Sequence, residues 1–143
     1  MGLSNMRHTP GLRAEVRQLN NTHPTDDCFL LLTARCSNAR ILTDEGRLAD
    51  LLTRLVEAID MNPLKTPAVT QAFNNPGLEA YVPIDDSNIT VSTYTNSERI
   101  VICIHSCKPF ETARIVRTLT EVADCSQIRQ QLCRESEFKE VDS

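Results

Sequence analysis

Two short patterns in this sequence carry residue types that can do chemistry. The first is Asp85-Asp86-Ser87, two carboxylates directly before a serine. Asp and Ser favour turns because their side chains bond nearby backbone groups, so a solvated turn is one interpretation. The other interpretation is a serine that attacks its own backbone. The three residues alone leave both interpretations open.

The second pattern is Cys103-x-His105-x-Cys107, which suits a strand because alternate side chains lie on one face. Three such ligands could hold zinc, but the sequence offers no fourth ligand, and we predict no metal site. His105 and Cys107 could instead form a nucleophilic pair, since a neighbouring imidazole favours the thiolate. No third residue that would orient this pair can be named from the sequence.

Hydrophobic periodicity predicts the elements that position these patterns. The run "CFLLLTA" (28–34) is typical of a buried strand, and within residues 43–60 Thr43 can cap a helix whose aliphatic residues share one stripe. Residues 109–124 form another amphipathic helix, with Pro109 in its first turn. Strands are predicted at 68–73, 78–84, 87–95 and 99–107, turns at 74–77 and 96–98, and a further helix at 125–138, with Cys125, Ile128 and Leu132 on one side.

The fold class that follows is α+β, a two-layer sandwich of a largely antiparallel sheet with helices on one face. In the last strand Ile100, Ile102 and Ile104 alternate with the residues of the second pattern, so the isoleucines should lie under the helices. The other sheet face is too apolar to face water alone, and we expect a second copy of the chain to cover it as a homodimer.

Composition limits the classes of function. Residues 1–25 are polar and aperiodic and are predicted to be a flexible N-terminal arm before a single domain at 26–143. The net charge of -4 gives nucleic acid no electrostatic reason to bind. No apolar run reaches the ~18 residues of a membrane span, and a signal peptide is not evident, so we expect a cytoplasmic protein with mostly reduced cysteines.

The segment "GLEAYVPIDDSNITVSTYTNSERIVICIHSC" (77–107) resembles the core of the prokaryotic S-adenosylmethionine decarboxylase family. That family reads approximately G-V-S-G, then E-S-H, an I-x-I-H-T-W-P-E strand and a hairpin into D-x-F-T-C-G. The resemblance runs without a gap to Cys107. It extends back through residues 28–61, which match the family's first strand, loop and helix in order.

The resemblance implies a self-processing enzyme. Ser87 matches the serine that attacks the preceding carbonyl, and Asp86 replaces the family glutamate, so the bond between Asp86 and Ser87 would be cleaved. Cleavage would convert Ser87 into a pyruvoyl cofactor. That group forms a Schiff base with the substrate amine and accepts electrons as carbon dioxide leaves, and Cys107 matches the cysteine that returns a proton. The implied substrate is S-adenosylmethionine, in the polyamine pathway to spermidine.

Some positions depart from the family pattern. Ser92 stands where the family has its processing histidine, Glu79 where it has an assisting serine, and Asn88 follows Ser87 in place of histidine. His105 and Glu79 are candidates for the missing base. The alternatives are therefore a non-cleaving homologue that binds or regulates, a pyruvoyl decarboxylase for a basic amino acid such as arginine or ornithine, or a cysteine-dependent enzyme that uses Cys107 and His105.

Overall fold

Four strands of this molecule alternate between buried and more exposed residues along their length. The computed structural model describes residues 26–72 and 76–142, so the predicted arm at 1–25 lies outside the described residues. Within the described part, one six-stranded antiparallel sheet has the strand order β2-β3-β4-β5-β1-β6. The strands are β1 Cys28–Cys36, β2 Ala68–Gln71, β3 Leu78–Ile84, β4 Ser87–Tyr94, β5 Arg99–Ser106 and β6 Cys125–Arg134.

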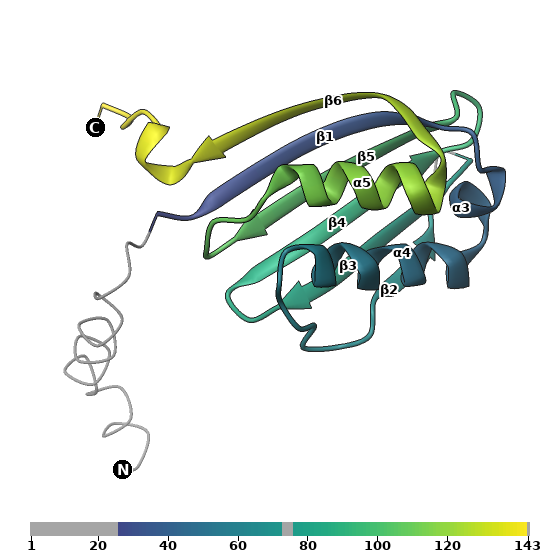
Figure 1. The fold of residues 1–143 in the computed structure, drawn as a ribbon, viewed down its shortest axis with the longest axis horizontal. Coiled ribbons are helices and arrows are strands. Elements are labelled where there is room, and N and C mark those ends of the chain that lie inside the picture. Colours follow the sequence, from purple (N-terminus) through teal and green to yellow (C-terminus); the bar gives the residue numbers. More distant parts are fainter. Residues whose placement is uncertain (1–25, 73–75, 143) are drawn as a thin grey trace, which may run out of the picture.

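The helices lie on one face of this sheet (Figure 1). They are α3 Ala39–Thr43, α4 Glu45–Ala58 and α5 Thr112–Ala123. Thr43, the predicted cap, is instead the last residue of α3, and the side chain of Asp44 caps α4 by accepting the Arg47 N–H at 3.1 Å. Pro109 also precedes its helix, because α5 begins after Glu111.

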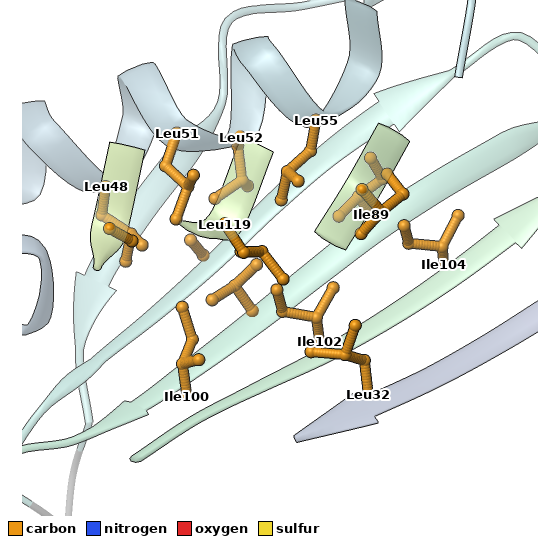
Figure 2. Packing of buried hydrophobic residues seen from close by; sticks show 14 of the residues in the cluster. Leu32, Leu48, Leu51, Leu52, Leu55, Ile89, Ile100, Ile102, Ile104 and Leu119 are labelled. Atoms are coloured by element: carbon orange, nitrogen blue, oxygen red, sulfur yellow. The ribbon is translucent and has the colours of Figure 1, made fainter. Parts of the chain in front are cut away.

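The hydrophobic core fills the space between the helices and the sheet. Figure 2 shows leucines of α4 and Leu119 of α5 pointing toward the isoleucines of β4 and β5. Ile100, Ile102 and Ile104 are at most 2% exposed, which confirms their predicted position under the helices. Each fully buried side chain of this size contributes about 1.5–3 kcal/mol through burial of apolar surface. This layer holds the sheet strands, and therefore the candidate residues, in fixed register.

The prediction of a helix at 125–138 was wrong. Residues 125–134 form the edge strand β6, which pairs with β1 along its length, and only Glu135–Glu137 form a short 3₁₀ turn, η1. Asp124 ends α5 in the left-handed region with φ 50, which turns the chain back onto the sheet. The pairing of β6 with β1 shifts by one residue opposite the segment between Thr33 and Arg35. Gln127, in the bulged part of β6, has φ 50.

This shift explains why the strand looked helical. A β-bulge adds one residue to the bulged strand, so two helix-facing positions beside it lie three residues apart instead of two. Cys125 and Ile128 have this spacing. Leu132 follows four residues after Ile128, which corresponds to two periods of a strand. An interrupted two-residue period thus reproduces the spacing of a helical stripe.

No helix or strand of the described residues covers the second face of the sheet (Figure 1), where only Phe138, just after η1, packs on Phe29, with ring centroids 5.2 Å apart. Phe29, Val101, Cys103 and His105 are half-buried there, and Leu31 is 57% exposed. This side, called the open face below, also carries polar residues such as Glu79 and Ser92, and it is the side predicted to need a partner. Among the described residues, no helix is long and apolar enough to cross a membrane.

Candidate functional site

Ser87 is the first residue of β4 and follows a two-residue hairpin turn. It pairs with Ile84 across the hairpin, which leaves Asp85 and Asp86 as the turn. Asp86 has φ 54, in the left-handed region where Asp is tolerated better than most residues. Such a conformation costs on the order of 1–3 kcal/mol in a non-glycine residue. Backbone strain is therefore stored next to the peptide bond between Asp86 and Ser87.

The Ser87 hydroxyl is enclosed and held by the backbone. The residue is 6% exposed, on the helix-facing side of β4 with Ile89. Its Oγ accepts a hydrogen bond from the N–H of Cys107 at 2.9 Å. Because an N–H occupies one acceptor position, the hydroxyl proton remains available for transfer to another group. The Cys107 Sγ lies 3.9 Å from the carbonyl oxygen of Asp85. The structure thus brings Ser87, Asp86 and Cys107 together.

His105 lies at the same end of the sheet as this cluster, but on the other face, the open face. It is directly opposite Asn88, the residue after Ser87, in the pairing of β4 with β5. Its Nε2 is 2.7 Å from Oδ2 of Asp27, and its ring stacks on Phe29 with centroids 4.7 Å apart and planes 4° apart. The carboxylate and the aromatic ring together restrict the imidazole to one position. His105 and Asp27 are both about one-third exposed, at 31% and 29% of their side chains.

Asp27 is a residue that the sequence interpretation missed. It directly precedes β1, and nothing in its neighbourhood in the sequence links it to a residue 78 positions later. The link arises because β1 pairs with β5, with Phe29 directly opposite His105. The only local signal was an acidic residue immediately before an apolar strand.

Glu79 and Ser92 form a separate pair. They are directly opposite each other in β3 and β4, and the Ser92 hydroxyl donates to Oε2 of Glu79 at 2.6 Å. Ser92 lies five residues along β4 from Ser87, which corresponds to roughly 16 Å of strand. Alternation places Ser92 on the open face, as it does His105, whereas Ser87 faces the helices. The distance along the strand therefore separates both Ser92 and Glu79, one of the two candidates for the base, from the Ser87 hydroxyl.

The second sequence pattern is split by the end of its strand. Cys103 and His105 share the open face of β5, while Cys107 lies past the strand end and contacts the Asp85 carbonyl. No group of three or more His, Cys, Asp or Glu side chains in residues 26–72 and 76–142 is arranged to hold a metal ion.

Hydrogen bonds brace the loops at the end of the sheet that holds Ser87. Lys108, just after Cys107, donates from Nζ to the Asp60 carbonyl at 2.8 Å, and Arg114 of α5 pairs with the Asp60 carboxylate at 2.8 Å. The N–H of Leu64 donates to the Pro83 carbonyl at 2.9 Å. These bonds tie the segment after α4 to both β3 and the start of α5. Ser87 is therefore in a braced part of the fold.

Comparisons with known proteins agree with this geometry. A sequence model of the family described as S-adenosylmethionine decarboxylase matches residues 30–135, a range that includes Ser87 and Cys107. The structure is similar to the crystal structure of the adenosylmethionine decarboxylase from Aquifex aeolicus VF5, with a TM-score of 0.66. That match has 15% sequence identity and covers 85% of this chain and 99% of the other. A comparison with curated proteins gave no match.

Proposed function

Because this chain belongs to the S-adenosylmethionine decarboxylase family, as a divergent member, we propose that it is a self-processing, pyruvoyl-dependent decarboxylase of S-adenosylmethionine. Its product would serve polyamine (spermidine) synthesis. One observation carries the proposal: the Ser87 oxygen is held at 2.9 Å by the Cys107 N–H, directly after the left-handed Asp86. The serine side chain and the backbone of the cysteine that the resemblance singles out are thereby in contact.

Processing begins when the Ser87 Oγ attacks the carbonyl carbon of Asp86. The amide C–N bond breaks as the new C–O bond forms, which converts the peptide bond into an ester on the serine oxygen. Elimination then releases Asp86 as a carboxylate, and hydrolysis of the remaining dehydroalanine releases ammonia and leaves the pyruvoyl group. The left-handed φ of 54 at Asp86 favours the attack, because leaving the turn relieves local strain.

His105 is the base in this proposal, and Asp27 positions it. It is directly opposite Asn88, the residue after Ser87, in the pairing of β4 with β5. It carries the only imidazole among the described residues. The Asp27 carboxylate at 2.7 Å stabilises the imidazolium that forms when a proton is accepted. Ser92 cannot take this role, since a hydroxyl is not a base near neutral pH.

The group derived from Ser87 fits this site because its precursor side chain is already enclosed and touches Cys107. When present, a pyruvoyl carbonyl binds a substrate amine and accepts electrons during loss of carbon dioxide. Cys107 returns the proton. Asp85 and Asp86 give the surroundings negative charge, which suits the cationic S-adenosylmethionine and also a basic amino acid such as arginine or ornithine.

The proposed enzyme is a homodimer in which a second copy covers the open face. Leu31 is 57% exposed there, beside half-buried Phe29 and Cys103. Exposed apolar side chains grouped on a sheet face favour contact with another surface. His105 and Asp27 lie on the same face, so dimer formation would also exclude water from the proposed base.

The second candidate function is that of a non-cleaving binding or regulatory homologue. It is favoured by Ser92 and Glu79, which hydrogen-bond to each other at the positions where the family has its histidine and serine. It is also favoured by the position of the Ser87 hydroxyl on the helix-facing side, opposite to His105.

Intact-mass spectrometry of the purified protein, denatured and fully reduced, tests the proposal. We expect two fragments, residues 1–86 and a chain that begins with pyruvoyl at position 87. The Ser87→Ala variant should remain one chain, and Ser106→Ala, which changes a neighbouring serine, should still cleave. A single uncut wild-type chain of 16.0 kDa after long incubation would reject self-processing and leave the binding role.

A further inference from the structure

Two cysteines that are far apart in the sequence lie opposite each other in the sheet. Cys36, the last residue of β1, is directly opposite Cys125, the first residue of β6. Directly opposed residues in antiparallel strands have Cα atoms about 4.5–5.5 Å apart. Disulfide bonds span Cα separations of about 4.4–6.8 Å, so this pair meets the requirement without backbone movement.

No other two cysteines in the described residues are directly opposite each other in the strand pairings. In the same pairings Cys28 is opposite Ser106 and Arg134, Cys103 is opposite Leu31 and Thr90, and Cys133 is opposite Phe29. Cys107 lies past the end of β5, against the Asp85 carbonyl. Any oxidation that follows strand geometry would therefore select Cys36 and Cys125.

The two thiols interact with each other inside the fold. Cys36 is 0% exposed and Cys125 is 6% exposed, and the Cys36 Sγ donates to the Ala123 carbonyl at 3.0 Å. A hydrogen bond from the Cys125 thiol lowers the pKa of Cys36, against the effect of burial. The same hydrogen bond and burial raise the pKa of Cys125. Cys36 is thus the better nucleophile of the pair.

The location of the pair gives an oxidant a route to it. β6 is an edge strand, and Cys125 is its first residue, directly after the left-handed Asp124 and two residues before the left-handed Gln127 of the bulge. Strand ends and edges open locally at a small fraction of the free energy of global unfolding. Opening the first residues of β6 would expose both sulfur atoms while the rest of the sheet stays paired.

We propose that Cys36 and Cys125 form a reversible disulfide that ties β1 to the edge strand β6. The oxidant is a low-molecular-weight disulfide. The Cys36 thiolate attacks one of its sulfurs, forms a mixed disulfide and releases one thiolate. The Cys125 sulfur loses its proton and attacks the Cys36 sulfur, which releases the second thiolate. Two protein thiols are oxidised, and the external disulfide is reduced to two thiols.

This bond would have consequences for the whole chain, and it does not depend on the proposed function. In an uncut chain it closes a loop of about 90 residues, which restricts the unfolded state and stabilises the fold. In a chain cut before Ser87, Cys36 and Cys125 belong to different fragments, and the bond joins them covalently. Ser87 lies at the opposite end of the sheet, so its contacts with Cys107 remain unchanged.

The test is to incubate the reduced full-length protein with oxidised glutathione, alkylate the remaining thiols and map the linked peptides. We expect one dominant cross-link, between Cys36 and Cys125, that dithiothreitol reverses. The melting temperature of the oxidised protein should rise by roughly 5–10 °C if the chain is uncut. Amide hydrogen exchange in β6 should slow. Glutathione adducts or cross-links at other cysteines, with Cys36 and Cys125 still alkylated, would overturn the proposal.

Variants separate this pair from general thiol reactivity. Cys125→Ser should abolish the cross-link and the rise in melting temperature, whereas Cys133→Ser, on the same strand, should retain both. If Cys125→Ser does not fold, the peptide map of the wild-type protein decides the matter by itself. A cross-link that persists in Cys125→Ser, or is lost in Cys133→Ser, would contradict the assignment.

Discussion

At the scale of single residues, the chemistry of this site depends on which backbone group each side chain meets. Ser87 is an ordinary buried serine apart from the Cys107 N–H at its oxygen and the left-handed Asp86 before it. His105 is an ordinary strand residue apart from Asp27 and Phe29, which hold its ring. In the strand register, His105 is opposite the residue after Ser87, on the other sheet face, whereas Glu79 and Ser92 are at the far end of the hairpin.

This placement predicts that His105→Gln slows self-cleavage by about 10²–10⁴-fold, the usual loss when a base is removed. Cleavage is followed as the loss of the uncut chain on a denaturing gel. Ser92→Ala should cleave at the wild-type rate, because its hydroxyl bonds Glu79 and not the processing residues. If Ser92→Ala were as slow as His105→Gln, the base would have been assigned to the wrong end of β4.

Asp27→Asn should slow cleavage as well, because the amide cannot stabilise an imidazolium as the carboxylate does. Asp27→Glu should recover part of the rate, because it retains a carboxylate. A purely structural role would lower the stability of Asp27→Asn in urea denaturation, whereas the proposed role slows cleavage in a variant that is as stable as wild type.

At the scale of elements, close contacts between strands decide where side chains are tolerated. Gly77, just before β3, has its backbone so near β4 that an added Cβ would lie 1.9 Å from the Thr93 carbonyl oxygen. Thr93 itself is fixed, since its hydroxyl donates to the Leu42 carbonyl at 2.9 Å and accepts from the Leu78 N–H at 2.8 Å. Neither strand can move away without breaking these bonds.

Gly77→Ala should therefore lower the free energy of unfolding by about 1–3 kcal/mol, the usual cost of forcing extra volume into a packed site. Urea denaturation followed by circular dichroism measures this change. Gly46→Ala is the matched control: its added Cβ would be 3.4 Å from Oδ1 of Asp44, and alanine favours helix α4 by about 0.4–1 kcal/mol. Equal effects of the two substitutions would show that the close approach to Thr93 does not limit the site.

At the scale of the whole molecule, the helices cover one sheet face, and the proposed second copy would cover the open face. Leu31 is exposed on that face, and Phe29 stacks there on His105 of the Asp27–His105 pair. The proposed assembly and the proposed chemistry therefore involve the same surface.

Leu31→Asp should convert the proposed dimer into a monomer, because a carboxylate would be buried without a partner in the interface. Light scattering coupled to size exclusion measures the mass in solution. Ala113→Asp, an exposed position on α5 in the helix layer, should leave the mass unchanged. A wild-type protein that is monomeric at high concentration would show that the open face has another role.

The sequence by itself determined most elements and the sidedness of the sheet. The stripe of α4 and the alternation of Ile100, Ile102 and Ile104 were predictable because burial imposes the periods of helix and strand on neighbouring residues. The hairpin around Asp85 and Asp86 was predictable from turn residues between two apolar runs. These features depend on interactions over a few positions of the chain.

Only the tertiary structure decided the pairings between distant residues. The register of β5 against β1 and β4 brings His105 to Asp27 and Cys107 to Ser87. The bulge in β6 gave a strand the apolar spacing of a helix, and pairing with β1 placed Cys125 opposite Cys36. A shift of one residue in any strand exchanges the faces of all its side chains, and this register is set by packing across the sheet rather than by neighbours in the chain.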